Sequence, residues 1–209
     1  MSYRARQRSD PELSFSDQEL RDLAVAWLTL SIAFALLFAP IHLGGSLGSF
    51  VVMVGLSLVT VGVAFLLHEI AHKVVAIEHG QVAEFRADYQ MLFLAIMGAL
   101  VGFLFAAPGA VYHRGQVTQR ENGLIALAGP VTNLLLALLF LPLMILPEPL
   151  GTIGQMGVWI NLFLAAFNMI PFGPLDGKSV LRWHKGIFAL IFVPSAALAA
   201  FVVFRVGMF

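Results

Sequence analysis

The stretch VGVAFLLHEIAHKVVAIEHG (61–80) decides how this chain folds. It continues an apolar run that begins near Leu47 and contains no charged residue before Glu69. An uncharged run of this length is typical of a helix that crosses a bilayer. On a helix, His68 and His72 lie one turn apart on the same face, so both imidazoles can reach one metal ion. The stretch therefore predicts a membrane-spanning helix with a metal-binding pair near its end.

Glu69 lies between these histidines and gives the pair a possible chemistry. A carboxylate beside a metal can take a proton from a metal-bound water and later pass it to a leaving amine. Ionisable groups are expensive in hydrocarbon, so a cluster of them at the end of an apolar helix indicates function. The alternative is that the helix has simply reached the interface, where His and Glu face lipid headgroups.

The composition agrees with a membrane protein. Of 209 residues, 59% are hydrophobic and 11% are charged, whereas soluble domains carry about a quarter charged residues. Lipid must therefore cover much of the surface. The formal net charge is zero, so no basic field indicates a nucleic-acid partner. There is no cysteine, so any metal must be held by His, Asp or Glu.

Further apolar runs surround the first one. They cover residues 23–41, 91–107, 124–146, 152–170 and 186–204. We expect an all-α polytopic membrane protein of about five to six transmembrane helices, with a short re-entrant or β-hairpin element. A polar arm, 1–15, precedes a single domain, 16–209, whose core is 47–177. Ser16 and Glu19 read as a capping box at the start of the first helix.

A catalytic metal needs a third protein ligand and an open position for water. Asp176 is the only acidic residue between Glu148 and the last residue, and it lies in a Pro- and Gly-rich break, 171–177. Irregular backbone at membrane depth is tolerated only where protein or a water-filled cavity surrounds it. Asp176 therefore suits the third ligand. Taken alone, it is better explained as the turn residue of a loop that leaves the membrane.

Three motifs together carry a family resemblance. They are HEIAH (68–72), AGPVTN (128–133) and NMIPFGPLDG (168–177), in that order. They resemble the site-2 protease family of intramembrane metalloproteases, and the match runs from about 47 to 177. Many members have a proline directly after the motif asparagine, where this chain has Met169. The chain is similar to compact prokaryotic and archaeal members without PDZ or CBS domains.

The resemblance implies roles for particular residues. The implied ligands of Zn²⁺ are His68, His72 and Asp176, and the implied catalytic base is Glu69. Asn168 is expected to hold the substrate backbone or the oxyanion, because an amide can bond a peptide carbonyl without titrating. Gly129 and Asn133 are expected to provide packing and polar contacts of the central helix, since small residues permit close helix approach.

The function that follows is that of an intramembrane zinc metalloprotease, which hydrolyses a peptide bond in or near a transmembrane segment. Its partners are then a transmembrane substrate protein and the lipid bilayer, and the sequence does not set its oligomeric state. The substrate helix must unfold locally, because helical carbonyls are already hydrogen-bonded.

Two alternatives stay open. A membrane metal-ion transporter also places His and acidic groups in the membrane, although transporters usually carry matched broken helices in two halves. A non-catalytic relative could bind membrane partners, but it would be free to lose Glu69.

Residues 105–112 combine small residues with alternating Val and Tyr, which suggests a strand edge near the site. Such an edge could pair with an unwound substrate by strand addition; a plain connecting loop is equally compatible. His113, in a polar segment, is expected to be exposed.

The ligands also constrain the topology. His68 and His72 lie at the C-terminal end of their helix, and Asp176 follows the C-terminal end of its own. The two helices must therefore cross in the same direction for these residues to meet. An odd number of crossings must lie between them, and the shorter run, 91–107, should therefore be re-entrant. Lys and Arg favour cytoplasmic loops. With a cytoplasmic N-terminus, every Lys and Arg except Arg205 lies on that side. We expect a multi-pass protein of the cell membrane, with its N-terminus and active site toward the cytoplasm.

Overall fold

The computed structural model describes residues 12–103 and 108–206. The helices are α1 (Asp17–Phe38), α2 (Leu47–Ser57), α3 (Val63–Glu78), α4 (Tyr89–Leu100), α5 (Gln119–Phe140), α6 (Leu150–Asn168), α7 (Gly177–Trp183) and α8 (Lys185–Val206). Strands β1 (Val82–Ala87) and β2 (Gly109–Arg114) form an antiparallel pair. A π-helical segment, Leu58–Gly62, joins α2 to α3 without a break. The expected all-α architecture with a β-hairpin element is confirmed.

Five helical segments of the described chain are long and apolar enough to cross a membrane. They are Asp17–Leu43, Leu47–Glu78, Gln119–Ile145, Leu150–Asn168 and Lys185–Val202. The helix α4 has 12 residues and is about 18 Å long at 1.5 Å per residue, too short to cross the hydrocarbon layer. The count of spanning helices is therefore five, at the lower end of the expected range.

The segment between the two strands leaves the hairpin and returns to it. The Asp88 amide donates to the Pro108 carbonyl at 2.9 Å, and Ala87 pairs with Gly109 in the ladder. The far end of α4 reaches the turn after α1, where a ring nitrogen of His42 lies 2.8 Å from the Leu100 carbonyl oxygen. The described ends of the run 91–107 thus lie close to the hairpin and to the turn after α1, and its re-entry from one side of the bilayer stays a prediction. Its residues 104–107, including the start of the expected 105–112 strand, lie outside the described residues.

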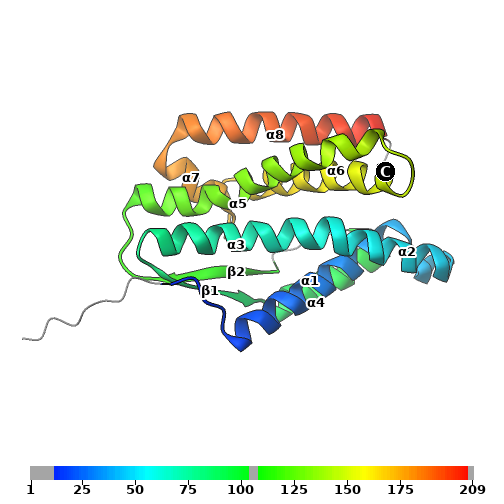
Figure 1. Ribbon diagram of the computed structural model, residues 1–209, viewed down its shortest axis with the longest axis horizontal. Coiled ribbons are helices and arrows are strands. Elements are labelled where there is room, and N and C mark those ends of the chain that lie inside the picture. The colour runs from blue at the N-terminus through cyan, green and yellow to red at the C-terminus, as the bar shows by residue number, and fades with distance from the viewer. Residues whose placement is uncertain (1–11, 104–107, 207–209) are drawn as a thin grey trace, which may run out of the picture.

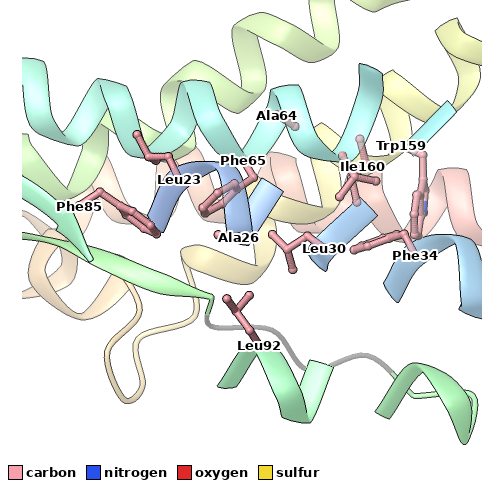
Figure 2. Packing of buried hydrophobic residues seen from close by; sticks show 11 residues of the cluster. Leu23, Ala26, Leu30, Phe34, Ala64, Phe65, Phe85, Leu92, Trp159 and Ile160 are labelled. Carbon is pink, nitrogen blue, oxygen red and sulfur yellow. The ribbon is translucent and has the colours of Figure 1, made fainter. Parts of the chain in front are cut away.

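The helices are arranged in layers around α3. In Figure 1, α5, α6 and α8 lie along one side of α3, while the hairpin, α1 and α4 lie along the other. The largest buried cluster joins α1 to α3, α6 and β1 (Figure 2). Phe65 of α3 meets Phe85 of β1 edge to face, with ring centroids 5.6 Å apart. The hairpin is therefore packed directly against the helix that carries the two histidines.

The predicted capping box at α1 is only half right. The Ser16 hydroxyl accepts from the Glu19 amide at 3.2 Å, as expected. The Glu19 carboxylate does not turn back to the cap, because it accepts from Lys73 and from the Phe85 amide instead. A full capping box occurs at α5, between Thr118 and Glu121. A buried carboxylate gains more from a cation and a strand amide than from an exposed cap.

Candidate metal centre

The metal-binding pattern of α3 lies in the interior of the protein. His68, Glu69 and His72 are 5%, 8% and 8% exposed. The Nε2 atoms of the two histidines are 3.0 Å apart, and Asp176 Oδ2 is 3.3 Å from each of them. The three expected ligands therefore converge, with one ligand atom from each within 4.8 Å of the others. Their role as ligands stays a prediction.

Hydrogen bonds from the far side of each ring fix how the imidazoles point. His68 Nδ1 donates to Asn133 Oδ1 at 2.6 Å, and His72 Nδ1 donates to the Ile125 carbonyl at 2.7 Å. A ring whose Nδ1 proton is used in this way presents the Nε2 lone pair to a metal. Both Nε2 atoms therefore face Asp176 in the form that a metal ion requires.

Asn133 is itself held by two neighbouring helices. Its amide nitrogen donates to the Ala64 carbonyl at 3.3 Å and to Asn161 Oδ1 at 2.9 Å. Asn161 in turn donates to the Gly157 carbonyl at 2.8 Å. The polar contact expected of Asn133 is thus a contact with an imidazole. Sequence reasoning missed Asn161, whose only signal is an amide within an apolar helix that must find a partner.

Gly129 lies against the same two rings. A Cβ at this position would be 2.5 Å from the Nε2 atoms of both His68 and His72. Packing was expected here, and the partner is the imidazole pair. Only glycine lets α5 approach α3 closely enough at this point.

The residues present fit a metal ion. Asp176 Oδ2 is buried and has no hydrogen-bond partner among the described residues, although two Nε2 atoms face it. Burial by itself raises the pKa of the Asp176 carboxyl, but in the absence of a metal the positive charge and hydrogen bonds of protonated imidazoles, His72 first, outweigh it and lower that pKa to about 2. Two imidazole nitrogens and one carboxylate oxygen leave a fourth position open, as in catalytic zinc sites.

A cavity of about 220 Å³ lies against this cluster. Its wall includes residues from α3, α6, the 171–176 break and β2, among them Glu69, Asn168 and Val111. The Asn168 amide donates one hydrogen to the Leu164 carbonyl at 3.0 Å. Because an amide carries two donor hydrogens, the other stays available. The expected base and the expected substrate amide therefore share one cavity with the metal cluster.

His113 was expected to be exposed, and that expectation is wrong. It lines the cavity, and its Nδ1 is buried without a hydrogen-bond partner among the described residues. Burial lowers the pKa of its imidazole, with a smaller contribution from His72. The cause is the strand register, which places His113 opposite the buried Ala83. In a strand, successive side chains point to opposite faces. This alternation along β2, rather than the polarity of the segment, was the signal that His113 faces the interior.

The fold and the site define a class: an integral membrane protein of several apolar helices whose buried His-His-Asp cluster adjoins a glutamate. Comparison with known proteins agrees. The chain is 41% identical over 196 residues to a Methanocaldococcus jannaschii protein that carries the name "putative zinc metalloprotease", and the match covers 91% of this chain and 97% of the relative.

Two bacterial proteins with the same name are also similar. The Bacillus subtilis relative is 32% identical over 145 residues, covering 59% of this chain and 66% of that protein. The Synechocystis relative is 34% identical over 122 residues, covering 55% and 27%. No family model and no solved structure matches the chain. The chain belongs to the family of metalloproteases that these relatives represent.

Proposed function

We propose that this protein is an intramembrane zinc metalloprotease of the site-2 type. The observation that carries the proposal is the buried Asp176 oxygen without a hydrogen-bond partner, faced by two oriented imidazoles and adjoined by Glu69. Zinc is the metal that the names of all three relatives state, and the donor set suits it.

A zinc ion held by His68, His72 and Asp176 would supply Lewis acidity to the scissile carbonyl and to an attacking water. Glu69 takes a proton from that water as the water oxygen adds to the carbonyl carbon. When the C–N bond breaks, Glu69 returns the proton to the departing nitrogen, so the products are a carboxyl group and an amine. The remaining amide hydrogen of Asn168 can bond the substrate carbonyl oxygen, where negative charge develops.

The substrate is a transmembrane protein that reaches the cavity from the bilayer and unwinds there. Strand β2 supports this proposal, because residues from Pro108 to Val111 line the cavity. An unwound segment can add to the outer edge of β2 by backbone hydrogen bonds. A transport function has less support, since the described ranges contain one His/Asp cluster of this kind and no second, mirrored one.

The replacement Glu69→Gln tests the reaction. It preserves size but cannot accept the proton, so we expect cleavage of a single-pass model substrate to fall by about 10²–10⁴-fold. Zinc content should stay at about one ion per chain. The control is Glu78→Gln, an exposed position at the end of the same helix. Turnover retained in Glu69→Gln would contradict the proposed mechanism and favour transport or a scaffold role.

The orientation in the membrane is part of the proposal. The start of α5, α7 and the end of α3 lie at the same end of the molecule (Figure 1). Arg114, Arg120 and Lys178 belong to this end, and basic residues favour the cytoplasm. Cysteines introduced at the exposed Ser46 and Gln116 can be probed with an impermeant thiol reagent on intact cells. We expect labelling at position 46 only; labelling at position 116 contradicts the orientation.

A further inference from the structure

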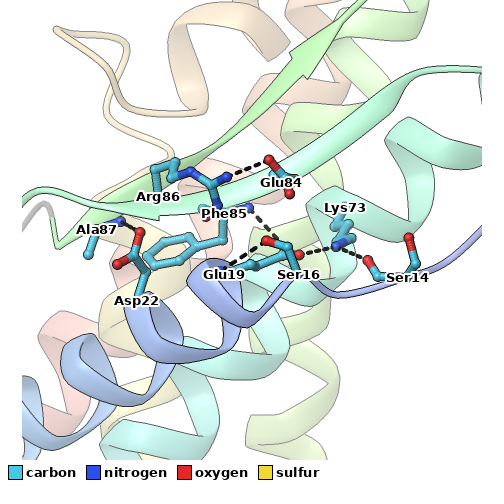
Figure 3. Close-up of polar contacts among 9 residues, drawn as sticks. All are labelled: Ser14, Ser16, Glu19, Asp22, Lys73, Glu84, Phe85, Arg86 and Ala87. Carbon is cyan, nitrogen blue, oxygen red and sulfur yellow. Dashed lines mark hydrogen bonds and ion pairs between the residues drawn. The ribbon is translucent and has the colours of Figure 1, made fainter.

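Two carboxylates of α1 reach the hairpin, although they lie far from it in sequence. Glu19 and Asp22 are 0% and 2% exposed. Glu19 Oε1 accepts from the Phe85 amide at 3.0 Å, and Asp22 Oδ2 accepts from the Ala87 amide at 3.4 Å. Asp22 also accepts from the Tyr89 hydroxyl at 2.6 Å. Figure 3 shows both carboxylates directed at the backbone of β1.

These contacts close one edge of the hairpin. Residues opposite one another in an antiparallel pair point both backbone groups either at the partner strand or away from it. The Phe85 amide bonds Glu19, so it points away from β2. Its carbonyl also points outward, where it accepts from the Arg86 guanidinium at 2.9 Å. The outward groups of β1 at Phe85 and the Ala87 amide therefore already have partners, and a further strand cannot pair there.

The opposite edge belongs to β2 and faces the metal cluster. Phe85 is paired with Val111 in the register, so the Val111 backbone groups point away from β1 as well. Val111 lines the cavity beside His68, Glu69 and His72. The hairpin thus has one edge covered by α1 and another directed toward the site.

The second oxygen of Glu19 reaches the metal helix. Glu19 Oε2 lies 2.5 Å from Lys73 Nζ, and Lys73 directly follows His72 in α3. Lys73 is 1% exposed; its ammonium also donates to the Ser14 carbonyl at 2.5 Å and lies 4.0 Å from the centre of the Phe15 ring. One carboxylate therefore bonds both the backbone of β1 and the residue beside a predicted zinc ligand.

A buried ion pair gives weak support to stability, because desolvation offsets the attraction of the charges. The contacts of the Glu19–Lys73 pair are better explained by a role in holding β1 against α3. We propose that Glu19 is a positioning residue: it holds the hairpin at a fixed register against α3, so that a substrate strand on β2 presents one bond to the metal. This inference rests on the proposed protease function and adds to it how the cut bond is selected.

The test uses the double variant Glu19→Gln/Lys73→Met, which removes both charges and leaves neither buried alone. The full chain is assayed with a single-pass model substrate, and the products are identified by mass spectrometry. We expect kcat to fall about tenfold with KM within about twofold, because misplacement affects the reacting geometry more than binding. We also expect new cuts two residues from the original bond, since a two-residue slip keeps the same side chains facing the site.

Zinc content should equal that of the wild type. The matched control is Glu121→Gln. Glu121 belongs to the capping box at the start of α5, so this variant should cut a single bond at the wild-type rate. An unchanged product and kcat in the double variant would overturn the inference, and so would a parallel loss of zinc. If the double variant does not fold, Glu19→Asp is measured instead, because it keeps a negative charge near Lys73 but shortens the side chain that reaches β1. An unchanged cut there also overturns the inference. Failure of the wild type to cut refutes the protease function itself.

Discussion

Helix α3 carries two buried polar clusters that differ in how their groups are satisfied. In the ion-pair cluster, Lys73 Nζ bonds Ser14 and Glu19, and the other oxygen of Glu19 bonds the Phe85 amide. In the metal cluster, the outer ring nitrogens are bonded, but the Nε2 atoms and Asp176 Oδ2 face one another around a shared point.

The α3 residues of both clusters are buried, and His72 and Lys73 are adjacent in sequence. Buried polar groups nearly always have partners. A cluster that is complete by itself indicates a structural role, whereas one with a convergent unpaired oxygen indicates a ligand from outside the chain. The two clusters therefore differ in whether every polar atom has a hydrogen-bond partner within the chain, and not in burial or charge.

The largest expected effect on metal binding comes from Asp176→Ala. It removes one of three ligands, so zinc should fall from about one ion per chain to nearly none. The control is Glu148→Ala, because Glu148 is exposed and, just before α6, accepts hydrogen bonds from Thr152 in the first turn of that helix. Metal analysis of the purified proteins decides the matter; equal zinc in both variants removes Asp176 from the site.

A smaller loss of zinc is expected for Gly129→Ala. The added methyl group would lie 2.5 Å from both Nε2 atoms, so the rings must move apart and zinc affinity should fall by about 10–100-fold, as for changes in groups that orient ligands. Gly55→Ala is the matched control, since a Cβ at this helical glycine meets no atom within 4 Å. Competition with a chelator gives both affinities. Similar affinities would show that α5 can shift to admit the methyl group.

The smallest effect on zinc, and a large effect on stability, is expected for Lys73→Met. It leaves the buried Glu19 carboxylate without its cation, which costs about 3–5 kcal/mol in comparable pairs. Adding Glu19→Gln should restore much of this loss, while zinc content stays at the wild-type level throughout. Denaturant unfolding in detergent measures the stability. Loss of zinc in folded Lys73→Met would show that the two clusters are coupled.

Helices α1 and α5 begin with the same Ser/Thr-x-x-Glu pattern but differ in structure, and the sequence does not predict this difference. Ser16-x-x-Glu19 and Thr118-x-x-Glu121 both predict a capping box. The structure has the box at Thr118, which is exposed, and directs Glu19 into the interior. Neighbours distant in sequence decide between these outcomes, and no local pattern contains Lys73 or the Phe85 amide.

The sequence by itself predicted a membrane protein of five to six long helices and the His68–His72 pair, and its family resemblance added Asp176. The helices and the pair follow from composition, from the length of apolar runs and from the one-turn spacing of His68 and His72. The sequence also predicts that the run 91–107 does not span the membrane, because ligands at corresponding helix ends require an odd number of crossings between them.

Only the tertiary structure decided that Asn133 orients His68, that His113 lines the cavity and that Glu19 bridges α3 and β1. The hydrogen bonds of Asn133 and Glu19 among these join residues 54 to 66 positions apart. Their physical reason is the same: a buried polar group takes whichever partner packing brings within reach, and packing is a property of the whole fold.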